Sequence, residues 1–480
     1  MNAAASCILF VRKKELCMKT DTIAAIATGM SNSGIGIIRI SGPEAVEVAD
    51  RIYQSKNKNK KLADQKTHTI HYGYIYDGDE LIDEVMVAIM KAPNSFTAED
   101  TVEIDCHGGM LVMKKIMEAV IKNGARAAEP GEFSKRAFLN GRIDLTKAEA
   151  VMDLIGSTNE YALKSSVSQL KGTVYRKIKK LREKIIYEIA FIESALDDPE
   201  HISTEGYPAK LSVIVDDLLK ELSEMIATFD NGRIMKEGIN VVILGKPNAG
   251  KSSLLNKLLG EDKAIVTDIA GTTRDVLEQF INLDGIGIHI VDTAGIRETE
   301  DLVEKIGVDK AKDHALNADL IIYVVDSSKE LDEDDWKIMD LMVHKKSIIL
   351  LNKSDLNTVV SMEDMEKAIK DFKEDCVILN TSMTEDEDLK ELEDTMKDMF
   401  IHGKIDMNEE VTITNIRHKE ALEEARSSLK LVKQSLADEM PEDFYSIDLM
   451  NAYASLGKII GEEVGEDLVN EIFSKFCMGK

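Results

Sequence analysis

Residues 245–253 carry the first pattern in the chain that could do chemistry. They read GKPNAGKSS, follow the apolar run INVVIL and precede the helix-forming run SLLNKLL. Glycines at this spacing let successive backbone N–H groups face a polyphosphate, Lys251 can reach its β and γ oxygens, and the Ser252 hydroxyl can bind Mg²⁺. The pattern predicts a phosphate-binding loop between a strand and a helix. Its residues are Asn248, Ala249, Gly250, Lys251, Ser252 and Ser253.

Two further motifs follow apolar runs downstream and predict the rest of a nucleotide site. DTAG, at 292–295, offers a carboxylate for the Mg²⁺ shell and a backbone N–H for the γ-phosphate. NKSD, at 352–355, offers a carboxylate that can accept from the N1–H and exocyclic amine of guanine, which adenine lacks. The three motifs in this order predict GTP as the nucleotide. The added residues are Asp292, Thr293, Ala294, Gly295, Asn352, Lys353 and Asp355.

The loop VTDIAGTTRD lies between these motifs and has two interpretations. One is a nucleotide-sensing switch, in which Thr273 closes over Mg²⁺ once the γ-phosphate is bound; the other is an ordinary polar hairpin. Ile296, directly after DTAG, is aliphatic where some GTPases carry a water-orienting Gln, so hydrolysis needs another device. The residues of the predicted switch are Thr267, Asp268, Ile269, Ala270, Gly271, Thr272 and Thr273.

The elements that must position these motifs fall into four zones after a leader at 1–19 that we expect to be disordered. Short β-rich runs with turn signals predict an α+β domain over 20–140, and apolar residues at a period of 3.6 predict helices over 141–238. Strands alternate with helices over 239–402, which predicts a parallel, doubly wound sheet, and 403–480 is helical again. We therefore predict a multidomain α/β and α+β chain, with a Ras-like P-loop G domain inserted into a discontinuous helical domain.

Composition restricts the partners. The 480 residues hold 60 Lys and Arg against 87 Asp and Glu, a net charge of −27, which disfavours a broad phosphate-binding surface. An RNA substrate would need a local patch or a basic partner. The five cysteines are odd in number and widely spaced, so they predict neither a disulfide framework nor a metal site but a reducing, cytoplasmic compartment. No apolar run reaches the roughly 18 residues that span a bilayer.

The sequence resembles a known protein family over much more than the GTPase motifs. From Thr20 to Lys480 the sequence resembles the MnmE (TrmE) family, the tRNA-modifying GTPases of bacteria and organelles. The resemblance implies a folate-binding-like N-terminal domain in front of the helical domain and its inserted G domain. The matching stretches are GIGIIRISG, NSFTAEDTVEI, RAAEPGEFSKRAFLNGRIDLTKAEAV, GKPNAGKSSLLN, IVTDIAGTTRD, DTAGIRE and the terminal FCMGK.

The resemblance implies ions and a catalytic group in the G domain. Asn248, Thr267, Ile269 and Thr272 would coordinate K⁺ beside the phosphates, where the cation supplies the charge that an arginine finger supplies in other GTPases. Mg²⁺ would remain with the loop serine and the switch threonine. Glu304, in DLVEKIG, would be the catalytic glutamate that orients the attacking water indirectly. By itself Glu304 has the pattern of a solvated helix carboxylate, so this role rests on the resemblance.

The resemblance also implies a tetrahydrofolate derivative, of the 5-formyl or 5,10-methylene type, as a one-carbon donor bound across a homodimer. Its contacts would be Arg39, Glu103, Arg142 and Lys480. A carboxylate can accept from the donor edge of a pterin, while Arg and Lys can meet the acidic tail. By itself Arg39, in the apolar GIGIIRISG, would be a strand residue at a sheet edge, and the sequence shows no partner for it.

A member of this family would be a K⁺-dependent GTPase that works on tRNA with a flavin-dependent partner. With the FAD- and NADH-dependent MnmG (GidA) protein it would add a carboxymethylaminomethyl or aminomethyl group to C5 of the wobble uridine of certain tRNAs. No strand here is followed by G-x-G-x-x-G, so the flavin would belong to the partner. The alternative is a ribosome-assembly or RNA-binding switch GTPase without modification chemistry. That alternative would favour a basic RNA-binding appendage, which the helical C-terminal zone does not resemble.

Cys477 stands three residues before the end of the chain, in FSKFCMGK. The spacing matches a C-a-a-X prenylation box, but a terminal Lys and the lack of a polybasic run argue against lipidation. The resemblance places Cys477 and Lys480 beside the folate, at the end of the helix EDLVNEIFSKF. Addition of a thiolate to the uracil ring is one role for Cys477 and requires a pKa below the usual value of about 8.5. A purely positional role is the other.

Overall fold

The protein forms two compact units. One comprises Met1–Met152, Ser168–Leu222 and Glu420–Lys480, and the other comprises Asp153–Val167 and Ser223–Lys419. The domain boundaries given above stay a prediction. The computed structural model describes residues 21–56, 60–260, 278–283, 286–292, 314–370, 376–382, 386–400, 411–476 and 479.

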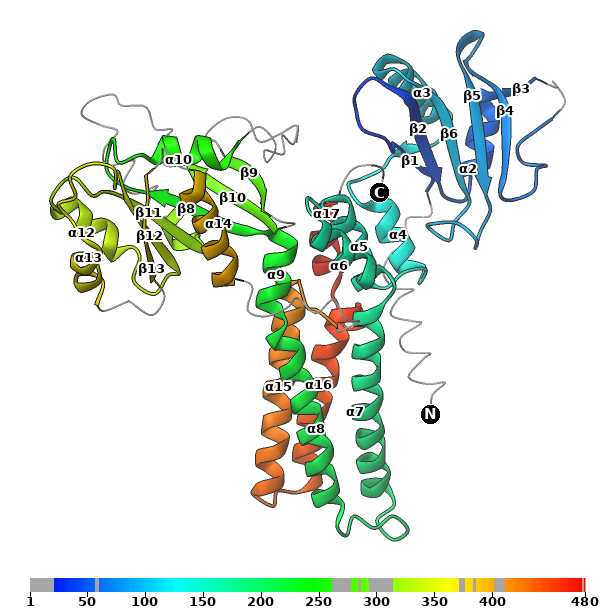
Figure 1. Ribbon diagram of the computed structural model, residues 1–480. Coiled ribbons are helices and arrows are strands. Elements are labelled where there is room, and N and C mark those ends of the chain that lie inside the picture. The colour runs from blue at the N-terminus through cyan, green and yellow to red at the C-terminus, as the bar shows by residue number, and fades with distance from the viewer. Residues whose placement is uncertain are drawn as a thin grey trace. The chain divides into compact units, whose positions relative to one another are not determined.

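The N-terminal part of the first unit is a seven-stranded sheet with the order β3-β4-β5-β6-β2-β1-β7 (Figure 1). Neighbouring strands are antiparallel except for the short parallel pair of β1 and β7. Its elements are β1 (Ile23–Ile26), β2 (Ser33–Ser41), α2 (Ala45–Ile52), β3 (Tyr53–Ser55), β4 (Thr69–Asp77), β5 (Glu80–Met90), β6 (Thr101–Gly108), α3 (Met110–Lys122) and β7 (Arg126–Ala127).

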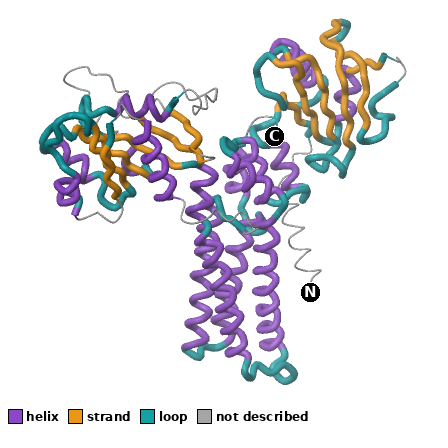
Figure 2. The backbone as a smooth tube through the Cα atoms, viewed as in Figure 1, coloured by secondary structure: helices purple, strands orange, loops and turns teal. Residues whose placement is uncertain are grey.

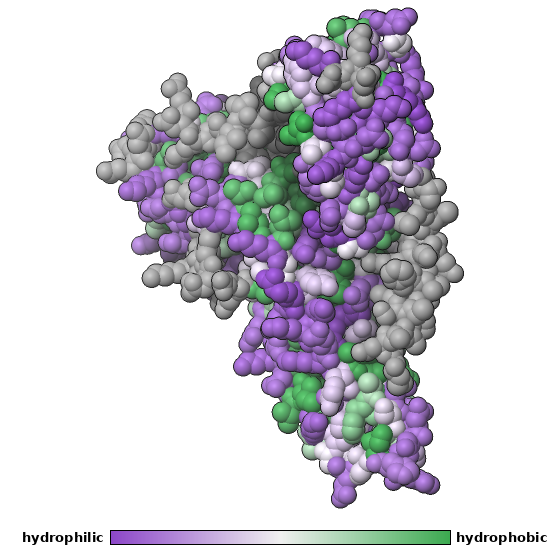
Figure 3. Space-filling model, turned by 90° about the vertical axis from the view of Figure 1, so that its right-hand side faces the viewer, coloured by the Kyte–Doolittle hydropathy of each residue, from purple (hydrophilic) through white to green (hydrophobic). Residues whose placement is uncertain are grey.

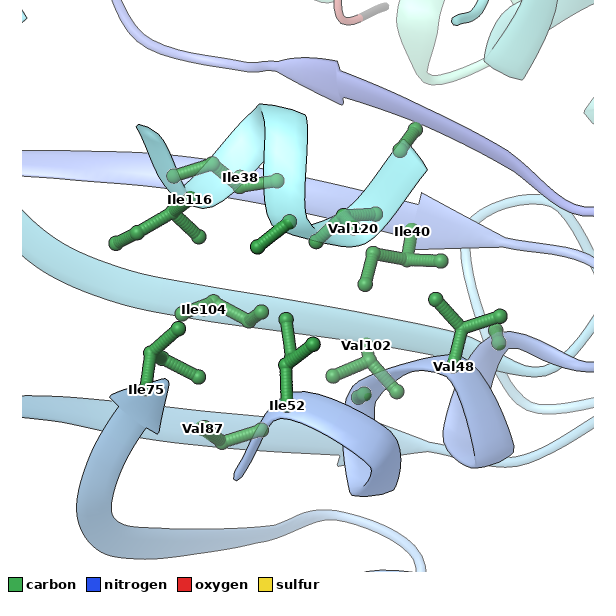
Figure 4. Packing of buried hydrophobic residues seen from close by; sticks show 14 of the residues in the cluster. Ile38, Ile40, Val48, Ile52, Ile75, Val87, Val102, Ile104, Ile116 and Val120 are labelled. Carbon is green, nitrogen blue, oxygen red and sulfur yellow. The ribbon is translucent and has the colours of Figure 1, made fainter. Parts of the chain in front are cut away.

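Alternation along β2 and β6 decides what faces the core. Ile38, Ile40, Val102 and Ile104 point toward residues of α2 and α3, including Val48, Ile52, Ile116 and Val120 (Figure 4). Successive side chains of a strand point to opposite faces, so the residues between them point away from this core. Those residues include Arg39 and Glu103, which stand directly opposite each other on the two strands.

A helical bundle forms the rest of this unit. Figures 1 and 2 show α7, α8, α15 and α16 running alongside one another. Ion pairs join neighbours: Lys177 to Glu221 at 2.5 Å and Lys458 to Glu424 at 2.6 Å. The helices that lie wholly or mostly in this unit are α4 (Glu132–Leu139), α5 (Leu145–Ile155), α7 (Thr173–Asp197), α8 (Tyr207–Ala227), α15 (Ile416–Ala437), α16 (Glu442–Ile460) and α17 (Glu466–Ser474). Two further helices, α6 (Glu160–Leu170) and α9 (Phe229–Glu237), belong mostly or wholly to the second unit.

The second unit contains a six-stranded sheet with the order β13-β12-β11-β8-β10-β9. All pairs are parallel except β9 with β10, and a hydrophobic cluster covers each face, as expected for buried parallel strands. The predicted fold class is confirmed. The elements are β8 (Ile239–Leu244), α10 (Lys251–Leu258), β9 (Glu278–Leu283), β10 (Ile286–Asp292), β11 (Leu320–Asp326), α12 (Glu333–Asp340), β12 (Ser347–Asn352), α13 (Met362–Ala368), β13 (Cys376–Asn380) and α14 (Asp386–Phe400).

Within the described residues, no helix combines the length and the apolar character needed to cross a membrane.

Candidate functional site

The predicted phosphate loop connects the end of β8 to the start of α10. Gly245, Asn248 and Gly250 have φ angles of 150°, 61° and 114°, a backbone that glycine adopts most readily. A side-chain carbon built at Gly250 would lie 2.1 Å from Asn352 Nδ2, and one at Gly245 would lie 2.4 Å from Val324 O. The glycines are therefore required because β11 and β12 approach the loop closely.

The loop also presents donors to an anion. Gly250 is the N-cap of α10, and no described side chain caps this terminus, so the first-turn N–H groups are available to a ligand. Lys251 Nζ donates to Gly245 O at 2.6 Å and to Lys246 O at 2.9 Å, and so lies against the loop. These residues fit a polyphosphate. The loop forms a cradle that a larger side chain would fill, and Lys251 places a cation at the edge of this cradle.

The NKSD motif is tied to this loop. Asn352 Nδ2 donates to Ala249 O at 2.7 Å, which joins the end of β12 to the phosphate loop. Lys353 has a φ of 65° and its Nζ donates to Asp326 Oδ2 at 2.7 Å. Burial would raise the pKa of Asp326, but hydrogen bonds from Lys353 and Ser328 lower it to about 2. The ionised carboxylate thus fixes Lys353 beside the motif.

Sequence reasoning missed two residues at the base end of the site. Ser382 Oγ donates to Asp355 Oδ1 at 3.1 Å, and Ser354 N donates to Thr381 O at 3.2 Å. Both Thr381 and Ser382 directly follow β13. A polar pair after another parallel strand reaches the same edge of the sheet, but this signal can be used only once β13 is known to belong to that sheet.

Part of the predicted site lies outside the described residues. The backbone of Asp292 ends β10, as predicted, and its side chain is not described. The structure brings together the phosphate loop, Asn352, Lys353 and Asp355. The predicted residues outside the described ranges are Thr267, Asp268, Ile269, Ala270, Gly271, Thr272, Thr273, Thr293, Ala294, Gly295, Glu304, Cys477 and Lys480.

A second cluster lies in the first unit and joins the two ends of the chain. Arg39 Nε pairs with Glu103 Oε1 at 2.8 Å, and Arg39 Nη1 donates to Gly479 O at 3.0 Å across 440 residues of sequence. The guanidinium also lies 6.0 Å from the ring centroid of Phe96 and 5.7 Å from that of Phe133. Arg39 therefore has the partners that the sequence could not reveal.

Close packing fixes the chain end at this cluster. Gly479 is buried with a φ of 85°, and a side-chain carbon there would lie 2.5 Å from Ile26 O on β1. Upstream, α17 lies against the start of α4, because a side-chain carbon at Gly131 would lie 2.3 Å from Phe473 O. Two glycines thus allow the C-terminal segment to reach the N-terminal sheet.

An ion-pair network holds α4 in place. Glu132 Oε1 pairs with Arg126 Nη2 at 2.5 Å and with Arg136 Nη2 at 3.1 Å. Burial would raise the pKa of Glu132, but hydrogen bonds from Arg126, the Glu129 backbone and Arg136 lower it to about 2. The following residue, Phe133, is the ring that Arg39 faces, so the network positions one wall of the cluster.

Arg142 lies at a neighbouring pocket rather than at the Arg39 cluster itself. The pocket has a volume of about 640 Å³ and opens to solvent. Among the described residues, Phe96 belongs to both places, because it lines the pocket and also faces Arg39. The pocket is lined by His68, Met90, Pro93, Asn94, Ser95, Phe96 and Arg142.

A phosphate loop at the carboxyl edge of a parallel sheet, joined to an NKSD motif, defines a P-loop GTPase that uses GTP with Mg²⁺. Comparison with known proteins identifies the particular group. The chain matches the family model described as the MnmE helical domain over residues 145–477 and that of the GTP-binding protein TrmE N-terminus over residues 22–142. The chain belongs to the MnmE (TrmE) family of tRNA modification GTPases.

Full-length relatives agree. The chain is 58% identical to the tRNA modification GTPase MnmE of Lachnoclostridium phytofermentans over 463 residues, covering 96% of this chain and 100% of the relative. It is 49% identical to the protein of the same name from Acetivibrio thermocellus, with the same coverage of 96% and 100%. The predicted family, and with it the prediction of a GTP hydrolase of tRNA modification, is confirmed.

Several solved structures are similar over part of the chain, and one of them serves as an example. Aquifex aeolicus Era, bound to GDP and aluminium fluoride, is 28% identical, covering 40% of this chain and 67% of Era, with a TM-score of 0.27. A score this low adds nothing to the fold assignment.

Proposed function

We propose that this chain is a K⁺-dependent GTPase that modifies C5 of the wobble uridine of certain tRNAs. With a flavin-dependent partner of the MnmG (GidA) type, it adds a carboxymethylaminomethyl or aminomethyl group. The one-carbon donor is a tetrahydrofolate derivative, and the working form is a cytoplasmic homodimer. GTP hydrolysis drives a conformational cycle, and the uridine chemistry takes place outside the G domain.

The contact between Arg39 and Gly479 carries this proposal. It joins the N-terminal sheet to the chain end in a unit that does not contain the phosphate loop. A switch GTPase without further chemistry has no need of a second polar cluster that draws residues from both ends of the chain. The cluster therefore favours an enzyme with two sites over the alternative of a ribosome-assembly or RNA-binding switch.

The chemistry of the second cluster suits a folate. Glu103 can accept from the donor edge of a pterin, and the neighbouring ring of Phe96 offers an apolar face. Arg142 is exposed at the adjoining pocket, where a guanidinium can meet a carboxylate tail. We propose that Arg39, Glu103, Arg142 and Lys480 hold a folate of the 5-formyl or 5,10-methylene type.

The G domain has its own proposed ligands. Ser252 and Thr273 hold Mg²⁺, while Asn248, Thr267, Ile269 and Thr272 hold K⁺. Asn248 is exposed on the phosphate loop two residues before Gly250, so its amide oxygen can serve as a hard ligand beside the phosphates. K⁺ at that position supplies the charge that an arginine finger supplies in other GTPases.

Two further residues complete the proposed chemistry. Glu304 orients the attacking water, in place of the Gln that is absent after DTAG. Cys477 is proposed as a site residue because Phe476 and Gly479, on either side of it, are both buried in the first unit. Its two roles, uracil nucleophile and positional anchor, are separated by Cys477→Ser: full tRNA modification by this variant would leave only the positional role.

The deciding experiment is nucleoside analysis of tRNA from a strain in which this gene is deleted, with and without the gene restored. We expect loss of the C5-modified wobble uridine in the deletion strain and its return on complementation. A complementing gene that carries Lys251→Ala should fail to restore it, because the phosphate loop is needed. Unchanged modification in the deletion strain would refute the proposal and leave the switch GTPase as the better explanation.

A further inference from the structure

Positive charge is concentrated on one segment of this acidic chain. Residues 171–184, KGTVYRKIKKLREK, hold seven Lys or Arg and a single acid, Glu183, in a protein with a net charge of −27. Almost all of this segment belongs to the first half of α7, in the helical bundle. A local concentration of this kind differs from the scattered, mixed charge of an ordinary solvated surface.

The helix presents much of this charge on its solvent face. Val174, Ile178 and Leu181 are buried, so Arg176, Lys179 and Lys180, between them, point outward and are exposed. In Figure 1 α7 lies at the right-hand edge of the bundle, the side that Figure 3 turns toward the viewer, where the upper bundle is largely hydrophilic. The exposed apolar residues of α7 occur later in the helix, at Ile186, Tyr187 and Leu196.

Acidic partners compensate only part of the charge. Lys177 and Lys184 share Glu221 of α8, at 2.5 Å and 2.6 Å, and so are used to join two helices. Within the described residues Lys179 and Lys180 have no ion-pair partner. Their ammonium groups are therefore available to an external anion.

A second observation points to the same surface. A side-chain carbon built at Gly172, the N-cap of α7, would lie 3.7 Å from Arg176 Nη1 and 3.9 Å from Lys147 Nζ. The two cationic heads thus both lie near Gly172, where Lys147 is ion-paired with Asp144 at 3.6 Å and Arg176 Nη1 donates to Lys171 O at 2.6 Å. Each head uses only part of its donors in these contacts, since a guanidinium has five N–H groups and an ammonium three, so both keep donors for an anion at the start of α7.

We propose that Lys147, Arg176, Lys179 and Lys180 form a binding site for the phosphate backbone of tRNA. The inference rests on the proposed function, since that function requires RNA to be held by a protein whose overall charge repels it. The site fixes the position of the RNA without reading bases, because ammonium and guanidinium groups on one helix face meet phosphates rather than base edges. Binding must then be strongly salt-dependent.

The test measures binding of a fluorescein-labelled, unmodified tRNA transcript to the full-length protein by anisotropy, at 50 and 200 mM KCl. The double variant Lys179→Glu/Lys180→Glu should bind at least tenfold more weakly than wild type, with the slope of log affinity against log salt reduced by roughly 1.5. The matched control is Lys210→Glu/Lys430→Glu, on exposed positions of α8 and α15 in the same bundle for which the described residues likewise offer no ion-pair partner, and it should change affinity less than twofold. GTP hydrolysis and thermal unfolding of both doubles verify that they fold.

Three results would overturn the site: equal losses in the two doubles, unchanged binding by the α7 double, or no tRNA binding by wild type at 50 mM KCl. A fourth is tighter binding of wild type to phosphatidylglycerol vesicles than to tRNA, which would assign the patch to a membrane surface. None of these results affects the nucleoside analysis of the deletion strain. An experiment that refutes the tRNA-binding site on α7 can therefore be distinguished from one that refutes the proposed function.

Discussion

The nucleotide site and the Arg39 cluster differ in how the chain builds them. The described part of the nucleotide site comes from short motifs that each follow a strand of one parallel sheet, so their order in the sequence also orders them in space. The Arg39 cluster joins residues 440 positions apart, and its key acceptor is a backbone carbonyl, Gly479 O. A site such as the nucleotide site can be recognised from side-chain motifs in the sequence. A site such as the Arg39 cluster can be recognised only from the folded structure, where Arg39 contacts the C-terminal segment.

The substitution with the largest expected effect disrupts the nucleotide site and leaves the Arg39 cluster intact. Gly250→Ala would put a carbon 2.1 Å from Asn352 Nδ2 at a φ of 114°, so the phosphate loop must shift. We expect GTP affinity to fall roughly 100-fold, measured by titration with a fluorescent GTP analogue, because the strain is worth a few kcal/mol. Folate binding should be unchanged. Gly260→Ala is the control, since its nearest neighbour would be 3.5 Å away, at Lys257 O; equal losses in both variants would refute the packing explanation.

Exchanging the monovalent cation should affect the nucleotide site and not the Arg39 cluster, and this needs no mutation. Replacing K⁺ by Na⁺ should lower GTP turnover more than tenfold, because the site proposed around Asn248 is for K⁺, which would supply positive charge where transition-state charge develops. Folate binding, measured in the same two buffers, should not respond. Equal turnover in both salts would remove the proposed cation from the mechanism.

The reciprocal substitution disrupts the Arg39 cluster and leaves the nucleotide site intact. Gly479→Ala would force a carbon to within 2.5 Å of Ile26 O, which displaces the chain end from Arg39. We expect the affinity for 5-formyltetrahydrofolate to fall about tenfold by calorimetric titration, since a hydrogen bond to a charged group and its packing are lost. GTP affinity should be unchanged.

The control for this variant lies in the same C-terminal segment. Gly465→Ala would place its carbon with nothing within 4 Å, so it should bind folate as wild type does. Wild-type folate affinity in Gly479→Ala would refute the proposal that the chain end is part of a folate site.

These two sites also show how far sequence reasoning reaches. The phosphate loop was predictable because glycine spacing, Lys251 and Ser252 report one loop between a strand and a helix. Ser382 was not predicted, since a lone serine carries no signal until β13 is placed at the edge of the same sheet. The partner of Arg39 was not predictable from composition or spacing, because Gly479 contributes only backbone and lies at the other end of the chain.

The smallest effect compares one buried carboxylate from each unit. Glu132 and Asp326 both have pKa values lowered to about 2, from ordinary values of 4.5 and 3.8. A lowered pKa in the folded state stabilises the protein above the unfolded-state pKa, and that stability is lost as the pH falls toward 2. Between pH 7 and pH 3 we expect losses of about 2 kcal/mol from Glu132 and about 1 kcal/mol from Asp326.

Urea unfolding at pH 7 and pH 3 tests this difference between the units. Glu132→Gln should remove about 2 kcal/mol of the pH dependence of the unfolding free energy and Asp326→Asn about 1 kcal/mol. The exposed Glu363→Gln in the first turn of α13 serves as the control for a lost charge. The order follows from the ordinary pKa values, because both pKa values fall to about 2 but that of Glu132 falls from 4.5 and that of Asp326 only from 3.8. Wild-type pH dependence in both variants would show that neither carboxylate is stabilised in its ionised form.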